Sequence, residues 1–338
     1  MKFDVVVGNP PYQEPGEARD EPIFQYFYDL ADKMSSQYCL ISPGRFLFNA
    51  GQTPESWNKK MLADDHLKVL FYEQNSSKVF AGTDIKGGLA VIYKDASSTV
   101  RPIGIFSQYS ELNSISHKVA GTNPHSFANL VQPQGIYKFS DLFFNDFPDA
   151  EKMQGKGTRN KIVSRSFSGM PFAFKDGPAP DQSSIQMLGL VSGKREYKWI
   201  EKKYLELPPS FDKWKVLVPE ANGSGAIGEV LSTPLIGQPL IGHTDTFLTI
   251  GEFNEESEAR NVLAYIKTKF ARTMLGVLKI TQHNSRKTWT QVPLQNFTSE
   301  SDIDWTVTIP EIDQQLYNKY GFDKGEIDFI ESKVKPMG

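Results

Sequence analysis

The chain has 338 residues, a formal net charge of −3 at pH 7 and a single cysteine, Cys39. One cysteine excludes an internal disulfide framework, and no apolar run is long enough to span a bilayer. The first residues, Met1 to Asp4, lack a signal-peptide pattern. These features predict a cytoplasmic protein with more than one domain.

The first informative feature is an apolar run over residues 3–8 that leads directly into Asn9-Pro10-Pro11-Tyr12. The two prolines fix the backbone, so the Asn9 side chain and the Pro10 carbonyl could accept hydrogen bonds from one exocyclic amine without being ordered during a reaction. The Tyr12 ring offers a surface on which an extruded base could stack. The alternative is a turn that only ends a strand. The tetrapeptide follows a short strand, and open α/β sheets bind their ligands at the carboxyl ends of strands. This position favours the catalytic interpretation over the turn.

The next elements follow from hydrophobic periodicity. Apolar residues at helical spacing predict a helix over residues 23–31, and residues 38–47 are typical of a strand followed by a loop. Further strands are expected at residues 69–72 and 88–93, with Phe80 between them. A strand, helix and strand in this order predict an α/β fold.

Together, these blocks resemble the gamma-class N6-adenine DNA methyltransferases, in particular those of single-chain type IIG restriction-modification enzymes. The resemblance implies a catalytic loop of Asn9, Pro10, Pro11 and Tyr12, with Asn9 and Pro10 also beside the methyl donor, S-adenosylmethionine. It implies base flipping, with Tyr12 and Phe80 stacking on the flipped adenine. A Val-Phe pair at a strand end is also typical of ordinary core packing.

In that family, the cofactor site is built mainly from a glycine-containing loop and an acidic residue that precede the Asn-Pro-Pro-Tyr block. Here the block begins at residue 9. Residues 1–105 are therefore expected to be the C-terminal half of a methyltransferase domain, a partial Rossmann-like sheet without its cofactor-binding strands. The glycine-rich residues 221–228 lack a following Gly-Lys-Ser/Thr and predict a tight loop rather than a phosphate-binding loop.

Residues 106–300 resemble the target-recognition domains of the same enzymes, and an α+β domain that binds double-stranded DNA is expected there. Residues 260–299 hold seven lysines and arginines and no acidic residue. One face of a helix over residues 256–278 should be buried, and its basic side chains should be exposed to solvent. The residues predicted to contact DNA are Lys267, Lys269, Arg272, Lys279, Arg286 and Lys287. The alternative is a solvated helix and loop.

Two further basic clusters lie between residues 150 and 205. The first predicts a DNA-facing loop and consists of Lys152, Lys156, Arg159, Lys161 and Arg165. The second interleaves lysines and Arg195 with aromatic residues over residues 194–204, a pattern that suits either base stacking or a half-buried strand. Both interpretations of the second cluster stay open.

The five histidines are isolated from one another and from Cys39, so no metal site is predicted. Residues 148–152 match a nuclease motif only weakly, so a nuclease, if the system has one, is expected on an upstream polypeptide or another chain. Residues 301–338 predict a helical tail, with a proline near the start of its first helix.

The sequence thus predicts site-specific adenine methylation in a restriction-modification system. The alternative is a non-catalytic recognition subunit that docks on a separate methyltransferase or nuclease chain through residues 3–7.

Overall fold

The computed structural model describes residues 3–15, 20–49, 52–85, 87–155, 157–179, 181–222, 227–279 and 283–337. The chain divides into two compact units, Met1–Asn113 and Ser114–Gly338. The boundary lies near the expected one at residue 105, and residues 301–338 belong to the second unit. The α/β character expected from the sequence is confirmed: helices and several small sheets alternate along the chain.

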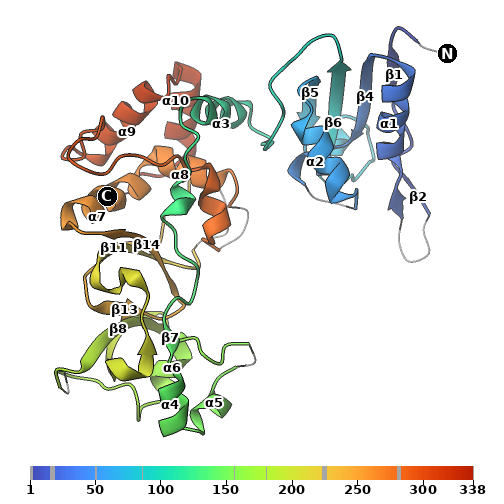
Figure 1. Ribbon diagram of the computed structural model, residues 1–338. Coiled ribbons are helices and arrows are strands. Elements are labelled where there is room, and N and C mark those ends of the chain that lie inside the picture. The colour runs from blue at the N-terminus through green and yellow to red at the C-terminus, as the bar shows by residue number, and fades with distance from the viewer. Residues whose placement is uncertain are drawn as a thin grey trace. The chain divides into compact units, whose positions relative to one another are not determined.

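A four-stranded sheet forms the centre of the first unit (Figure 1). Its strands, in spatial order, are β1 (Val6–Gly8), β4 (Gln37–Pro43), β6 (Leu89–Asp95) and β5 (Leu67–Glu73). β1 and β4 are parallel, whereas β6 is antiparallel to both of its neighbours. The sheet therefore has β1 and β5 as its edges, and the Asn-Pro-Pro-Tyr block follows the end of an edge strand.

Two helices, α1 (Phe24–Met34) and α2 (Glu55–Ala63), contribute side chains to the core of this unit. Tyr28 of α1 packs edge-on against Tyr38 of β4 and donates to or accepts from Ser42 at 2.9 Å. Val6 packs against the same cluster, so the alternation of a strand turns its neighbours Val5 and Val7 to the other face. The predicted helix and strands of this unit are confirmed. Its remaining elements are β2 (Gln13–Glu14), β3 (Glu21–Pro22), η1 (Gly44–Phe48) and η2 (Ser76–Lys78), and α3 (Ser110–Thr122) spans the boundary.

The second unit contains two three-stranded sheets and a small two-stranded one. One sheet has the order β13 (Ile241–His243), β8 (Ser184–Val191), β9 (Lys194–Glu201), and another the order β12 (Leu235–Gly237), β11 (Trp214–Pro219), β14 (Phe247–Phe253). The small sheet pairs β7 (Lys138–Phe139) with β10 (Leu205–Glu206).

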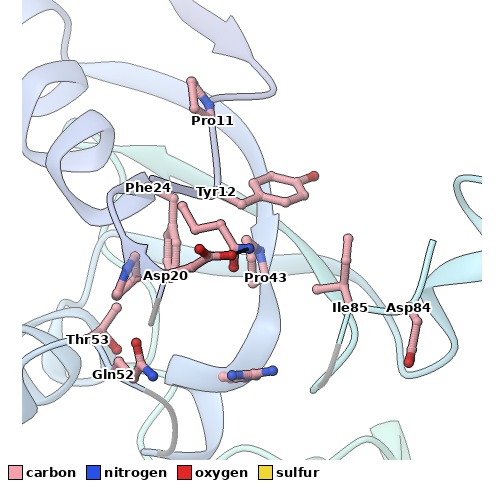
Figure 2. Close-up of a pocket in the computed structure, with 12 residues that line it drawn as sticks. Pro11, Tyr12, Asp20, Phe24, Pro43, Gln52, Thr53, Asp84 and Ile85 are labelled. Carbon is pink, nitrogen blue, oxygen red and sulfur yellow. Dashed lines mark hydrogen bonds between the residues drawn. The ribbon is translucent and has the colours of Figure 1, made fainter. Parts of the chain in front are cut away.

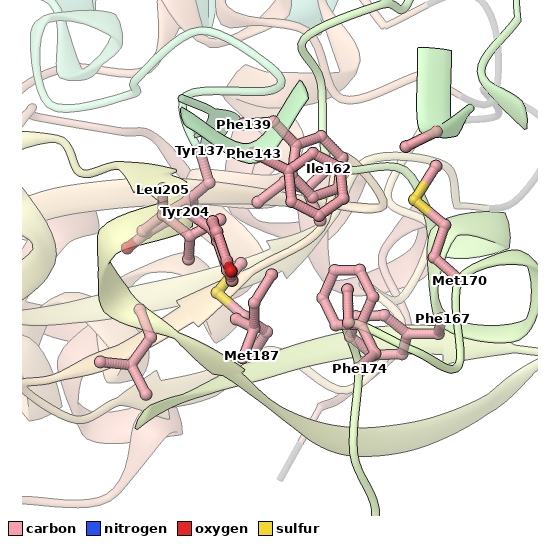
Figure 3. Close-up of a cluster of buried hydrophobic side chains, with 14 of the residues drawn as sticks. Tyr137, Phe139, Phe143, Ile162, Phe167, Met170, Phe174, Met187, Tyr204 and Leu205 are labelled. Atoms are coloured by element: carbon pink, nitrogen blue, oxygen red, sulfur yellow. The ribbon is translucent and has the colours of Figure 1, made fainter. Parts of the chain in front are cut away.

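An aromatic-rich core includes side chains of β8 and β9 (Figure 3). Phe139 and Phe143 stack with ring centroids 4.2 Å apart, and Ile162, Phe167 and Met187 are buried in the same cluster. The helices and turns around it are α4 (Asp141–Asp146), α5 (Ala150–Met153), α6 (Ser164–Gly169), η3 (Phe127–Asn129), η4 (Lys202–Tyr204) and η5 (Pro209–Asp212). On β9, Trp199 is half-buried, whereas Tyr197 is exposed.

The helix expected over residues 256–278 is interrupted. α7 (Glu256–Lys267) ends at Thr268, whose side chain accepts a hydrogen bond from the Ala271 backbone N–H and so caps a new helix, α8 (Lys269–Gly276). η6 (Arg286–Gln291) follows. The helical tail is confirmed as α9 (Ile309–Lys319) and α10 (Lys324–Lys333), and both begin with capping boxes.

One lysine is fully buried in the second unit. The Lys215 ammonium donates to four backbone carbonyls, those of Ser210, Phe211, Lys213 and Gln238, at 3.0–3.3 Å. It thereby ties η5 to the end of β12. Burial lowers the pKa of Lys215 to about 8.

This lysine makes the stability of the second unit depend on pH. An unfolded lysine has a pKa of about 10.4, so between pH 8 and 10.4 the unfolded chain binds more protons and the free energy of unfolding should rise with pH, by roughly 3 kcal/mol in all. Below pH 8 the lysine is protonated in both states, so the free energy of unfolding no longer changes with pH through this group and the cost of burying its charge is fully present. Lys215→Met should abolish this rise in urea unfolding, whereas Lys213→Met, on a side chain bonded to Asn254, should retain it. An unchanged slope in Lys215→Met would contradict the assignment.

Candidate functional site

A cavity of about 490 Å³ opens beside the Asn-Pro-Pro-Tyr block in the first unit (Figure 2). Five segments of the unit contribute to its wall. The apolar lining residues are Pro11, Tyr12, Pro22, Phe24, Pro43 and Ile85, and the polar ones are Gln13, Asp20, Arg45, Gln52, Thr53 and Asp84. Apolar walls with a few polar groups are typical of small-molecule and nucleobase sites.

Tyr12 is held at this cavity by the chain that follows it. Its carbonyl accepts a hydrogen bond from the Ile23 N–H at 3.1 Å, and β2 and β3 form a short hairpin between the two residues. Across that hairpin, the Gln13 amide donates to Asp20 at 2.6 Å (Figure 2). Local pairing therefore fixes the backbone at Tyr12, whose ring lies in the cavity wall.

Asn9 and Pro10 connect β1 to the cavity wall. Asn9 is exposed and Pro10 half-buried, whereas Pro11 and Tyr12 line the cavity. The Tyr12 hydroxyl is shielded from solvent and has no well-directed hydrogen bond within the described residues. Burial raises the pKa of Tyr12, and the neighbouring Asn9 side chain opposes this rise. Tyr12 is thus neutral near pH 7 and suited to stacking rather than to proton abstraction.

Arg45 enters the cavity lining from the turn after β4. Gly87 has φ of +84°, and a side chain at this position would overlap the Arg45 stem. The Gly44 N–H donates to the Gly88 carbonyl at 2.9 Å, and the Tyr72 hydroxyl donates to the Gly87 carbonyl at 3.2 Å. Arg45, Asp20 and Asp84 were not predicted from the sequence to belong to this site. The Gly87-Gly88 pair before β6 was the one local signal of a close backbone approach.

Phe80 is not among the residues that line the cavity. It is 36% exposed and lies in a turn, where its N–H donates to Ser76 and its carbonyl accepts from Thr83. Ile85, five residues later, reaches the cavity instead. The structure therefore brings Tyr12, but not Phe80, to the cavity.

The basic residues expected to contact DNA differ in exposure. Arg272 is 2% exposed and donates to the carbonyls of Lys267, Thr268, Gly228 and Lys335. Lys279 is 3% exposed and donates to the Asn222 carbonyl at 2.7 Å. The expectation that these two side chains contact DNA is corrected, because both are buried and bonded to backbone.

The other four expected DNA contacts lie nearer the surface. Lys269 forms an ion pair with Glu331, and Lys267 is half-buried. Arg286 and Lys287 are exposed at the start of η6. In the predicted basic loop of residues 152–165, Arg159 pairs with Glu151, and Lys156 lies outside the described residues.

Metal ligands do not gather within the described part of the chain: it holds no group of three or more His, Cys, Asp or Glu side chains able to bind an ion. Among the described helices, none is long and apolar enough to cross a membrane.

Comparison with known proteins gives a match for the first unit. Residues 1–80 match the family model described as Eco57I restriction-modification methylase. This match confirms the resemblance of the amino-terminal segment to restriction-modification methylases. No curated protein matches the chain.

Two solved structures are similar over 98% of the chain. One is the type IIL restriction-modification enzyme MmeI in complex with DNA, at 11% identity and a TM-score of 0.33, and the other is the type IIG restriction endonuclease BpuSI, at 10% identity and a TM-score of 0.35. The chain covers 56% and 53% of these proteins, so it spans just over half of their lengths.

Proposed function

We propose that this protein methylates the N6 amine of adenine in duplex DNA, with S-adenosylmethionine as donor, within a restriction-modification system. The observation that carries the proposal is the cavity beside β1, in which Tyr12 is fixed and which Asn9 and Pro10 adjoin. The match of residues 1–80 to a restriction-modification methylase family supports a methyl-transfer role.

The chemistry assigned to the loop is polarisation of an amine. The adenine N6 lone pair is delocalised into the ring, so two acceptors on its N–H bonds are needed to localise the pair for in-line attack on a methyl group. The Asn9 side-chain oxygen and the Pro10 carbonyl would provide them, and rigid prolines keep both in place. No covalent enzyme intermediate is required.

The Tyr12 ring would stack on the extruded base, and Phe24, Pro43 and Ile85 would exclude water around it. S-adenosylmethionine supplies the methyl group when bound. Asn9 and Pro10 would lie beside it.

A second candidate function is favoured by the outer edge of the sheet. Phe3 and Val5, just before β1, and Val7 within it are 45%, 48% and 72% exposed. An edge strand with exposed apolar side chains can pair with another chain. Under this alternative, the protein is a non-catalytic recognition subunit that docks on a separate methyltransferase or nuclease chain.

The test is transfer of radiolabelled methyl from S-adenosylmethionine to mixed-sequence duplex DNA, followed by digestion to nucleosides. Label in N6-methyldeoxyadenosine is the expected result. Label in a cytosine product would contradict the adenine assignment. Unlabelled DNA together with sequence-specific binding would support the recognition subunit instead.

A further inference from the structure

Four segments of the second unit, far apart in sequence, are joined edge to edge by three backbone hydrogen bonds. The Asp245 N–H donates to the Ile162 carbonyl at 2.9 Å, the Glu220 N–H to the Thr246 carbonyl at 2.9 Å, and the Asn284 N–H to the Glu220 carbonyl at 2.7 Å. The backbone therefore forms a continuous strip from residue 162 through 245 and 220 to 284.

Buried side chains anchor both ends of this strip. Ile162 is fully buried in the aromatic core (Figure 3). At the other end, the Trp289 indole is buried and donates to the Asn284 carbonyl at 3.1 Å. The strip is thus part of the rigid structure of the second unit.

Charges alternate in sign along the strip. Lys161 and Arg165 lie at its first end, and Arg286 and Lys287 at its last. Asp245 and Glu220 lie between them, and Glu220 accepts a hydrogen bond from the His283 ring at 2.9 Å. We give the name junction strip to seven side chains along this backbone: Lys161, Arg165, Asp245, Glu220, His283, Arg286 and Lys287.

The carboxyl group of Asp245 interacts with groups at the first end of the strip. Burial raises the pKa of Asp245, and the Ser164 N–H together with the charges of Lys161 and Arg165 opposes this rise. Glu220 raises the same pKa, as expected of a nearby carboxylate.

We propose that the junction strip lies across a groove of duplex DNA, with its cationic ends on the two phosphate backbones and its central carboxylates facing the base edges. This inference rests on the proposed recognition role of the second unit and names the surface that performs it. A duplex presents phosphates, then base edges, then phosphates, and the strip has the complementary order of charges.

The carboxylates also indicate which bases are contacted. Asp and Glu would be repelled by phosphates, but they accept hydrogen bonds from exocyclic amines, above all cytosine N4 in the major groove. Lys161, Arg165, Arg286 and Lys287 therefore supply affinity for any sequence, whereas Asp245 and Glu220 supply the preference for particular bases.

The experiment measures binding of the full chain to a random-sequence duplex pool, with sequencing of the bound fraction and titration at several salt concentrations. The double variants Lys161→Gln/Arg165→Gln and Arg286→Gln/Lys287→Gln should each reduce the salt slope by about 0.9 per lost phosphate contact, with the preferred sequence unchanged. Asp245→Asn, which keeps the side-chain shape, should change discrimination at one base pair by roughly 5- to 100-fold. Glu220→Gln provides an independent second variant.

Lys324→Gln is the matched control, because Lys324 is an exposed lysine of the same unit paired with Asp328 on α10. If all strip variants behave like this control while the wild-type chain still selects a sequence, the proposed DNA contact of the junction strip is overturned and the recognition role of the second unit stands. If the wild-type chain selects no sequence, the recognition role and the strip both fail.

Discussion

Replacing Asn9 with alanine is expected to reduce the rate of methyl transfer by about 10²–10³-fold, the loss typical of removing one preorganised polar group from a reacting centre. Asn9 follows β1 and adjoins the Tyr12 wall of the cavity, where its side-chain oxygen would be one of two acceptors for the adenine amine. Without it, the lone pair of the amine stays delocalised. The measurement is single-turnover methyl transfer in the reconstituted enzyme.

DNA affinity separates this role from a structural one. Asn9 is exposed, so its loss should leave the fold and duplex binding unchanged. Gln74→Ala removes another exposed amide of the same unit, outside the cavity lining, and should leave the rate unaffected. An unaltered rate in Asn9→Ala would contradict the proposed chemistry, whereas equal losses in both variants would point to damage of the unit as a whole.

The local features of the first unit could be predicted because their determinants are close in sequence. The periodicity of α1, the alternation of β4 and β6 and the rigidity of Pro10-Pro11 each depend on a few adjacent residues. The cavity could not be predicted in full. Arg45 and Asp84 reach it from loops almost 40 residues apart, and only the paired strands bring those loops together.

The DNA-binding predictions failed where tertiary structure overrode periodicity. A single helix over residues 256–278 would leave Arg272 on the wet face, but Thr268 ends α7 and starts α8 in a new phase. The guanidinium then meets the carbonyls of Gly228 and Lys335, which no local pattern could place beside it. A cluster of lysines and arginines in a sequence does not by itself distinguish an exposed cation from a buried side chain that donates to backbone carbonyls.

In the junction strip, by contrast, the fold joins two basic clusters that are separate in the sequence. Lys161 and Arg165 belong to one predicted basic cluster, and Arg286 and Lys287 to another. The hydrogen bonds through Asp245 and Glu220 join the two clusters, although more than 100 residues separate them. Neither acidic residue could be selected from the sequence, because each is isolated and its position depends on the turn after β13 or the end of β11.

Trp289→Ala should lower the free energy of unfolding of the second unit by about 3–5 kcal/mol, as for other fully buried aromatic residues. The indole is 1% exposed, packs against Phe127 with ring centroids 5.4 Å apart and donates to the Asn284 carbonyl at 3.1 Å. Truncation would leave a cavity and an unpaired carbonyl. Denaturant unfolding followed by circular dichroism measures the change.

Trp199→Ala is the matched control, because that tryptophan is half-buried on β9 and donates to the Gly177 carbonyl. Trp199→Ala should lower the free energy of unfolding clearly less than Trp289→Ala does. Because Asn284 pairs with Glu220, Trp289→Ala should also loosen the end of the strip that carries Arg286 and Lys287, and weaken DNA binding at temperatures where the unit is still folded. A large loss of stability with unchanged DNA affinity would separate the core role of Trp289 from support of the strip, and would place the DNA contact elsewhere on the unit.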